Sequence, residues 1–136
     1  MNSSTIELNS ATDYDRAFGA ARLERAPESR VATLDLPEHK SVLISVVEGT
    51  SQGIERGMTV PLVTIGRLRG GADIEIDDPQ VSRLHCAIEV KNDSVLLRDL
   101  RSTNGTYIGD KRVHAALLVG SAEFRIGETK IRVAVH

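Results

Sequence analysis

From residue 41 onward, the chain is a series of short apolar runs separated by turn residues. These runs cover residues 41–49, 58–66, 72–76, 84–90, 94–100, 123–127 and 129–136. Several of them alternate apolar and polar residues with a period of two, as Ile131, Val133 and Val135 do with the residues between them. This alternation is typical of a strand with one buried face. Closely spaced short strands with Gly and Asn/Asp turns predict an all-β fold, an antiparallel sandwich or barrel.

Residues 1–40 have a different pattern. The segment DYDRAFGAARLERA contains a short helical pattern, which Thr12 or Asp13 would cap and Pro27 would end. Gly19 weakens that helix, and its apolar stripe is thin. The segment carries five basic and seven acidic residues, a composition that favours solvation over burial. We therefore predict a mostly disordered N-terminal arm with a transient short helix over residues 1–40, and one folded domain over residues 41–136.

Composition narrows the class of protein. The 136 residues include 17 basic and 19 acidic side chains, a net charge of −2, whereas nucleic-acid-binding surfaces are usually strongly basic. Few aromatic side chains could stack on bases: Tyr14, Phe18, Tyr107 and Phe124. We therefore expect no nucleic-acid partner.

Cysteine, histidine and hydropathy patterns bear on compartment and cofactors. Cys86 has no partner for an internal disulfide, which is typical of a reducing compartment, and its apolar neighbours predict a buried thiol. No signal pattern or membrane-length apolar run is present, so we expect a cytoplasmic protein without membrane contact. The histidines have no metal-ligand spacing, and we expect no metal or cofactor.

Three polar segments interrupt the β pattern: GRLRGG at residues 66–71, VSRLH at residues 81–85 and RSTNGTY at residues 101–107. Each alone has an ordinary structural explanation: a turn with solvated arginines, a histidine that fixes a loop, and an Asn-Gly turn. The first lacks the GK[ST] ending of a P-loop and the GxGxxG pattern of a dinucleotide-binding loop. The second has no nucleophile elbow around Ser82 and His85, so we expect no enzyme activity in this chain.

The order and spacing of these segments are more specific than any one of them. Across roughly residues 42–135, the chain resembles the forkhead-associated (FHA) domain, a phosphothreonine-binding β-sandwich, at three motifs: Gly66-Arg67, Ser82-Arg83-x-His85 and Ser102-Thr103-Asn104-Gly105-Thr106. Two turns outside these motifs depart from the common family pattern: Gly109-Asp110 and Gly120-Ser121. The resemblance implies two antiparallel sheets of about eleven strands in total, with recognition loops gathered at one end.

The resemblance also implies a role for each matched residue. Arg67 is expected to reach the phosphate with its guanidinium, Ser82 to donate its hydroxyl, and Arg83 to add a further phosphate contact. Thr103 is expected to lie near the phosphate, and Asn104 to bond to the ligand backbone. Three further residues are expected to shape the loops: Gly66, His85 and Gly105.

The function implied by the resemblance is phosphothreonine-dependent peptide binding in Ser/Thr-kinase signalling. The implied partners are a phosphothreonine-containing protein and a Ser/Thr protein kinase. One alternative is a sensory FHA segment of a larger enzyme, such as a diguanylate cyclase or another effector. Another is a degenerate FHA fold that serves only for protein contacts.

Some bacterial FHA proteins bind their own phosphorylated arm, and the arm here offers Thr12, Thr5 and Thr33 as candidate phosphorylation sites. Thr33 has seven residues between it and Ser41, a reach of at most about 26–29 Å. Thr12 has twenty-eight, a flexible span of about 30 Å, comparable to the domain itself. Thr12 also has an acidic residue, Asp15, at its +3 position. We expect phosphorylation of Thr12 or Thr5 to close the arm onto the recognition loops; the alternative is that residues 1–40 are an inert linker.

Overall fold

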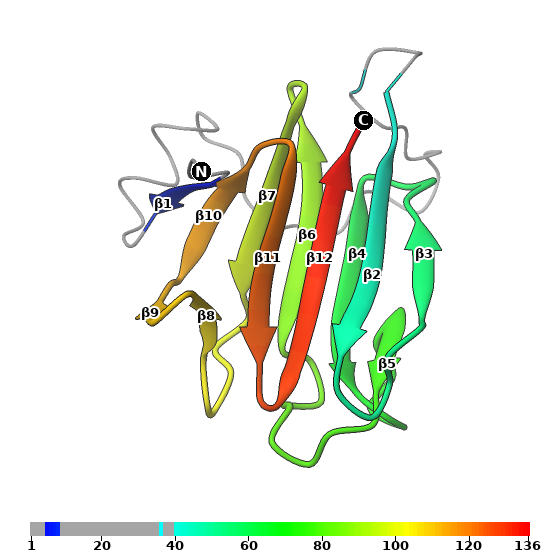
Figure 1. Cartoon of the computed structure of the whole chain (residues 1–136), viewed down its shortest axis with the longest axis vertical. Coiled ribbons are helices and arrows are strands. Elements are labelled where there is room, and N and C mark those ends of the chain that lie inside the picture. Colours follow the sequence, from blue (N-terminus) through cyan, green and yellow to red (C-terminus); the bar gives the residue numbers. More distant parts are fainter. Residues whose placement is uncertain (1–4, 9–35, 37–39) are drawn as a thin grey trace, which may run out of the picture.

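The computed structural model describes residues 5–8, 36 and 40–136. Over these ranges the chain forms twelve strands, which are arranged as two six-stranded sheets (Figure 1). In spatial order, the first sheet contains β1 (Thr5–Leu8), β10 (Ala115–Leu118), β7 (Ser94–Asp99), β6 (Cys86–Lys91), β4 (Leu62–Arg67) and β5 (Ile74–Ile76). The second contains β3 (Glu55–Gly57), β2 (Val42–Glu48), β12 (Thr129–Val135), β11 (Ser121–Ile126), β8 (Thr106–Ile108) and β9 (Lys111–Arg112).

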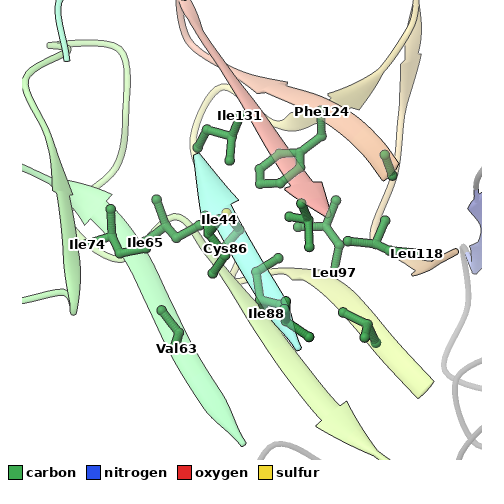
Figure 2. Close-up of a cluster of buried hydrophobic side chains, with 14 of the residues drawn as sticks. Ile44, Val63, Ile65, Ile74, Cys86, Ile88, Leu97, Leu118, Phe124 and Ile131 are labelled. Atoms are coloured by element: carbon green, nitrogen blue, oxygen red, sulfur yellow. The ribbon is translucent and has the colours of Figure 1, made fainter. Parts of the chain in front are cut away.

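The two sheets pack face to face because their strands alternate buried and exposed side chains. In β11, Ala122, Phe124 and Ile126 are buried and the residues between them are exposed. Figure 2 shows side chains from both sheets converging in one cluster, among them Ile44 of β2 and Cys86 of β6. Burial stabilises each large aliphatic side chain by about 1.5–3 kcal/mol. Burial also raises the pKa of the Cys86 thiol, which therefore behaves as the predicted small apolar side chain.

The predicted two-sheet antiparallel sandwich is confirmed, with one parallel pair. Every other ladder in the described residues is antiparallel, but β5 runs parallel to β4, with Ile65 opposite Ile74. Asp73, just before β5, secures this pair because its carboxylate accepts hydrogen bonds from the backbone N–H and the hydroxyl of Thr64, at 2.9 and 3.0 Å. Because β5 runs in the same direction as β4, the loop between them turns back from Arg67, and β5 begins opposite Ile65.

The three polar segments of the sequence lie at one end of the sandwich, the lower end in Figure 1, which we call the loop end. β4 ends there, β6 begins there and β7 ends there. The connections at this end include the β4–β5 loop (residues 68–73), the β5–β6 loop (77–85) and the β7–β8 loop (100–105). Ser41 and His136 lie at the opposite end, where their backbones exchange hydrogen bonds of 2.8 and 2.9 Å.

Residues 5–8 form a strand within the segment predicted as an arm. β1 pairs antiparallel with β10 at the edge of the first sheet, and it makes the strand count in the described residues one more than the expected eleven. The predicted helical pattern between Thr12 and Pro27 lies outside the described residues, and so does Thr33. In the described part of the chain, no helix is long and apolar enough to cross a membrane.

Candidate functional site

Arg67 ends β4 at the loop end, and the β5–β6 loop fixes its position. Its backbone N–H donates to the carbonyl of Ser82 at 2.9 Å, and its Nη1 donates to the carbonyl of Val81 at 3.2 Å. The preceding residue, Gly66, is so close to the neighbouring loop that a Cβ would lie 1.7 Å from the carbonyl oxygen of Arg83. No side chain fits that space, so glycine at position 66 lets the two loops pack directly against each other.

His85 connects the second loop to the third. Its side chain is completely buried. Nδ1 accepts a hydrogen bond from the backbone N–H of Ser82 at 3.0 Å, so the ring proton is on Nε2, which donates to the carbonyl of Gly105 at 2.9 Å. Burial lowers the pKa of His85 below its ordinary value of 6.5. The ring therefore stays neutral at pH 7, as an acceptor at Nδ1 requires.

The side chains of Ser82 and Asn104 lie where the second and third loops meet. Ser82 Oγ accepts a hydrogen bond from the backbone N–H of Thr103 at 3.0 Å. An oxygen that accepts in this way keeps its own hydrogen to donate elsewhere. Asn104 is exposed, and its Nδ2 donates to the carbonyl of Gln80 at 2.9 Å. The remaining Asn104 groups and the Ser82 hydrogen are thus available to a ligand at the same surface.

Asp99, at the end of β7, holds the third loop, although the sequence analysis assigned it no role. Its Oδ1 accepts from the hydroxyls of Ser102 at 2.6 Å and Thr106 at 2.8 Å, and its Oδ2 accepts from the backbone N–H of Ser102 at 3.1 Å. Gly105 follows with φ of +94°, a left-handed conformation that favours glycine, and donates its N–H to Ser102 Oγ at 3.0 Å. These bonds keep Asn104 at a defined place.

Asp78 is the corresponding anchor of the second loop, and sequence reasoning missed its role too. Asp78 is buried, with 5% of its surface exposed. Oδ1 accepts from the backbone N–H of Gln80 at 2.9 Å, and Oδ2 accepts from the N–H of Glu128 and the hydroxyl of Thr129, both at 2.8 Å. These contacts tie the second loop to the β11–β12 turn of the other sheet. The local Asp-Pro-Gln sequence, a common turn pattern, is the signal that points to this anchor.

The loops also carry exposed positive charge. Arg69, Arg83 and Arg101 are exposed. Arg69 and Arg101 have φ of 69° and 58°, left-handed conformations that are uncommon for residues with side chains. With Arg67, these arginines give the loop end four guanidinium groups, a setting that favours an anionic ligand.

The structure thus brings together the five residues that the sequence analysis placed at the binding site: Arg67, Ser82, Arg83, Thr103 and Asn104. Among the candidate phosphorylation sites, Thr5 lies in β1, and Thr12 and Thr33 lie outside the described residues. The residues that the structure describes contain no group of three or more side chains that could hold a metal ion.

Comparison with known proteins points to the same family. The family model of the FHA domain matches residues 63–127, which include all three loops. Glycogen accumulation regulator GarA of Mycobacterium tuberculosis is 29% identical over 111 residues, covering 82% of this chain and 68% of that protein. Oxoglutarate dehydrogenase inhibitor of Corynebacterium glutamicum is 30% identical over 91 residues, covering 67% of this chain and 63% of that protein.

A solved structure extends the likeness to three dimensions. It comes from a structural and functional analysis of phosphothreonine-dependent FHA domain interactions, and it matches with a TM-score of 0.63 and 31% sequence identity. The match covers 71% of this chain and 97% of that one. On its sequence motifs, its sandwich fold and these likenesses, the chain belongs to the FHA domain family.

Proposed function

We propose that this chain is a phosphothreonine-dependent peptide-binding module of Ser/Thr-kinase signalling. The observation that carries the proposal is the convergence of Arg67, Ser82 and Asn104 on three cross-linked loops at one end of a rigid sandwich. The likeness to a domain studied for phosphothreonine-dependent interactions supports this chemistry. The relatives named above are a regulator and an inhibitor, which supports a regulatory role without a catalytic step.

The arrangement suits the phosphate group. Phosphothreonine carries close to two negative charges and three acceptor oxygens at neutral pH. Ser82 has its hydroxyl hydrogen to donate, and Arg67 uses one nitrogen for the Val81 carbonyl while its other N–H groups can reach an anion. Each charge-assisted hydrogen bond contributes about 1.5–3 kcal/mol. Two or three such bonds, together with hydrogen bonds from Asn104 to the backbone of the peptide, correspond to a binding free energy near −8 kcal/mol, or a Kd of about 1 μM.

The proposed partners are a phosphothreonine-containing protein and the Ser/Thr kinase that modifies it, in the cytoplasm. We also propose that the chain's own arm competes for the site when it is phosphorylated at Thr12 or Thr5. A tethered ligand has an effective concentration of about 1 mM, well above a micromolar Kd, so the arm would occupy the site most of the time. The acidic Asp15 at the +3 position of Thr12 supports that residue as the preferred site.

Calorimetry with a phosphothreonine peptide chosen from a peptide library tests the proposed function. Arg67→Ala should weaken binding by about 2–5 kcal/mol, because the phosphate loses a charged partner. The control is Arg132→Ala, which removes an equal charge from β12 on the second sheet, where Arg132 pairs with Glu123 at 2.6 Å. The control should bind as the wild type does. Equal affinity for the phosphorylated and unphosphorylated peptides, or full affinity in Arg67→Ala, would show that the site has another function.

A further inference from the structure

Arg112 of β9 lies against the β7–β8 loop, which carries Asn104. β9 pairs with β8, and β8 directly follows this loop in the chain (Figure 1). Nη2 of Arg112 donates a long hydrogen bond of 3.4 Å to the carbonyl of Ser102. A Cβ on Gly105 would lie 2.6 Å from Nε of Arg112 and 3.0 Å from its Cδ. The side chain of Arg112 therefore lies across Gly105, in space that only a glycine leaves open.

The peptide bond between Ser102 and Thr103 separates Arg112 from Ser82, the proposed phosphate contact. The N–H of this bond, on Thr103, donates to Ser82 Oγ at 3.0 Å, and its carbonyl, on Ser102, accepts from Arg112. The N–H and C=O of a trans peptide point in opposite directions. Ser82 Oγ and Arg112 Nη2 therefore lie on opposite sides of the loop, about 9 Å apart at most.

The positive charge of Arg112 is not neutralised by a paired carboxylate. In the part of the chain that the structure describes, neither Arg101 nor Arg112 forms an ion pair with a carboxylate. Asp99, which holds this loop, accepts hydrogen bonds from the loop's own hydroxyls and N–H instead. On the second sheet, by contrast, Lys130 and Arg132 each pair with a glutamate. Arg101 and Arg112 are both exposed, so their remaining N–H groups can bind an anion from solution.

We propose that Arg112, together with Arg101 at the start of the same loop, forms a second anion subsite. This subsite binds an acidic side chain or a second phosphate two residues from the phosphothreonine of the bound peptide. The inference rests on the phosphothreonine recognition proposed above, and it adds a selectivity for the sequence of the partner. Arg112 lies outside the three motifs that identified the site.

The distance between the two subsites fits an extended peptide. Extended residues rise by about 3.3 Å each, and their side chains alternate between opposite sides. Two residues therefore span about 7 Å and place their side chains on the same side of the peptide. This span is within the limit of about 9 Å between Ser82 Oγ and Arg112 Nη2. The peptide backbone between the two side chains would then pass over the loop that carries Asn104, the proposed backbone contact.

Calorimetry with phosphothreonine peptides that differ at one residue tests the second subsite. One pair of peptides carries glutamate or glutamine two residues after the phosphothreonine, and another pair carries them two residues before it. At one of these positions, the wild-type protein should bind the glutamate peptide about fivefold more tightly than the glutamine peptide, because an exposed ion pair is added. Phosphoserine there should raise the preference to about tenfold or more, because it carries more charge. A gain with phosphoserine alone would identify the second anion as a phosphate, whereas no gain at either position would overturn the subsite.

Arg112→Gln tests whether Arg112 is responsible for this preference. The variant should reduce the preference for the glutamate peptide to less than about twofold. The control is Arg132→Gln, which removes an equal charge from the second sheet, where Arg132 pairs with Glu123. The control should keep the full preference of the wild type.

Two results would show a diffuse attraction of charges and overturn the subsite. One is a preference that persists in Arg112→Gln, and the other is an equal gain when the glutamate is moved to five residues from the phosphothreonine. The same peptides separate this inference from the proposed function. If they bind the wild type without any preference, only the second subsite is wrong. If none of them binds, phosphothreonine recognition is wrong and the second subsite with it.

Discussion

Replacing Asp78 with asparagine should destabilise the domain by about 2–3 kcal/mol, although Asp78 is not one of the proposed ligand contacts. The carboxylate is buried and accepts three hydrogen bonds, one at Oδ1 from Gln80 and two at Oδ2 from Glu128 and Thr129. Asparagine has one oxygen to accept with. If that oxygen takes the Oδ2 position, the new amide group opposes the N–H of Gln80, so one charge-assisted bond is lost and a donor is left unsatisfied.

Thermal unfolding measures this effect. For a domain of this size, 1 kcal/mol corresponds to about 4–8 °C in Tm, so Asp78→Asn should lower Tm by about 10–20 °C. Asp77→Asn is the matched control, because Asp77 is the exposed neighbour with the same charge. It should leave Tm within about 2 °C of the wild type. Equal Tm values for the two variants would refute the assignment of Asp78 as an anchor.

Asp78→Asn should also weaken phosphopeptide binding, through its effect on Gln80. The carbonyl of Gln80 holds the Asn104 side chain at 2.9 Å. Loosening that backbone should weaken phosphopeptide binding about tenfold, near 1.4 kcal/mol, at a temperature where the variant is still folded. Asp77→Asn again controls for charge, since both variants remove one negative group from the same loop. A folded Asp78→Asn protein that binds as tightly as Asp77→Asn would refute the link between the anchor and the ligand contact.

Two further predictions follow from the packing of the loops. Gly66→Ala should lower the free energy of unfolding, measured with urea, by about 3 kcal/mol, because its Cβ meets the Arg83 carbonyl. The control is Gly57→Ala, whose Cβ meets nothing within 4 Å and which should cost less than about 0.5 kcal/mol. Similar costs for the two variants would contradict the close approach at Gly66. His85 should titrate below its ordinary pKa of 6.5 in the folded protein, as NMR of its ring can measure. The unfolded chain then binds its proton first, so the stability that His85 contributes is complete above pH 6.5 and declines as the pH falls through the folded pKa; a ring that titrates at or above 6.5 would contradict its role as a neutral bridge.

The long strands and the three binding motifs are determined by the sequence itself. β2, β11 and β12 each have six or seven residues, enough to show a period of two that one buried face imposes. The loop motifs are also visible because each uses residue types with few substitutes. Gly66 has no room for a Cβ, and Asn104 presents an amide that both donates and accepts. Such local requirements are readable without a structure.

The shortest strands were decided by the tertiary structure. Outside the predicted runs, β9 has two residues, β3 and β8 have three, and β10 has four. Runs this short show no period, so each is a strand only because a neighbouring strand pairs with it. The pairing of residues 5–8 with β10 is a case of the same kind, because the alternation in these four residues is too short to predict a strand within a mostly polar segment.

The hydrogen-bond partners of the side chains that support the binding site were also decided by the tertiary structure. Asp78 is hydrogen-bonded to Thr129, 51 residues away, and His85 to Gly105, 20 residues away. In the sequence, Asp78 differs from its exposed neighbour Asp77 by the Pro79 that follows it, a turn signal that does not reveal burial. The difference arises from the partners that folding brings to it, because a buried carboxylate is stable only where several donors converge. The sequence therefore determined which side chains could face a phosphate, and the packing of the two sheets determined which ones hold them in place.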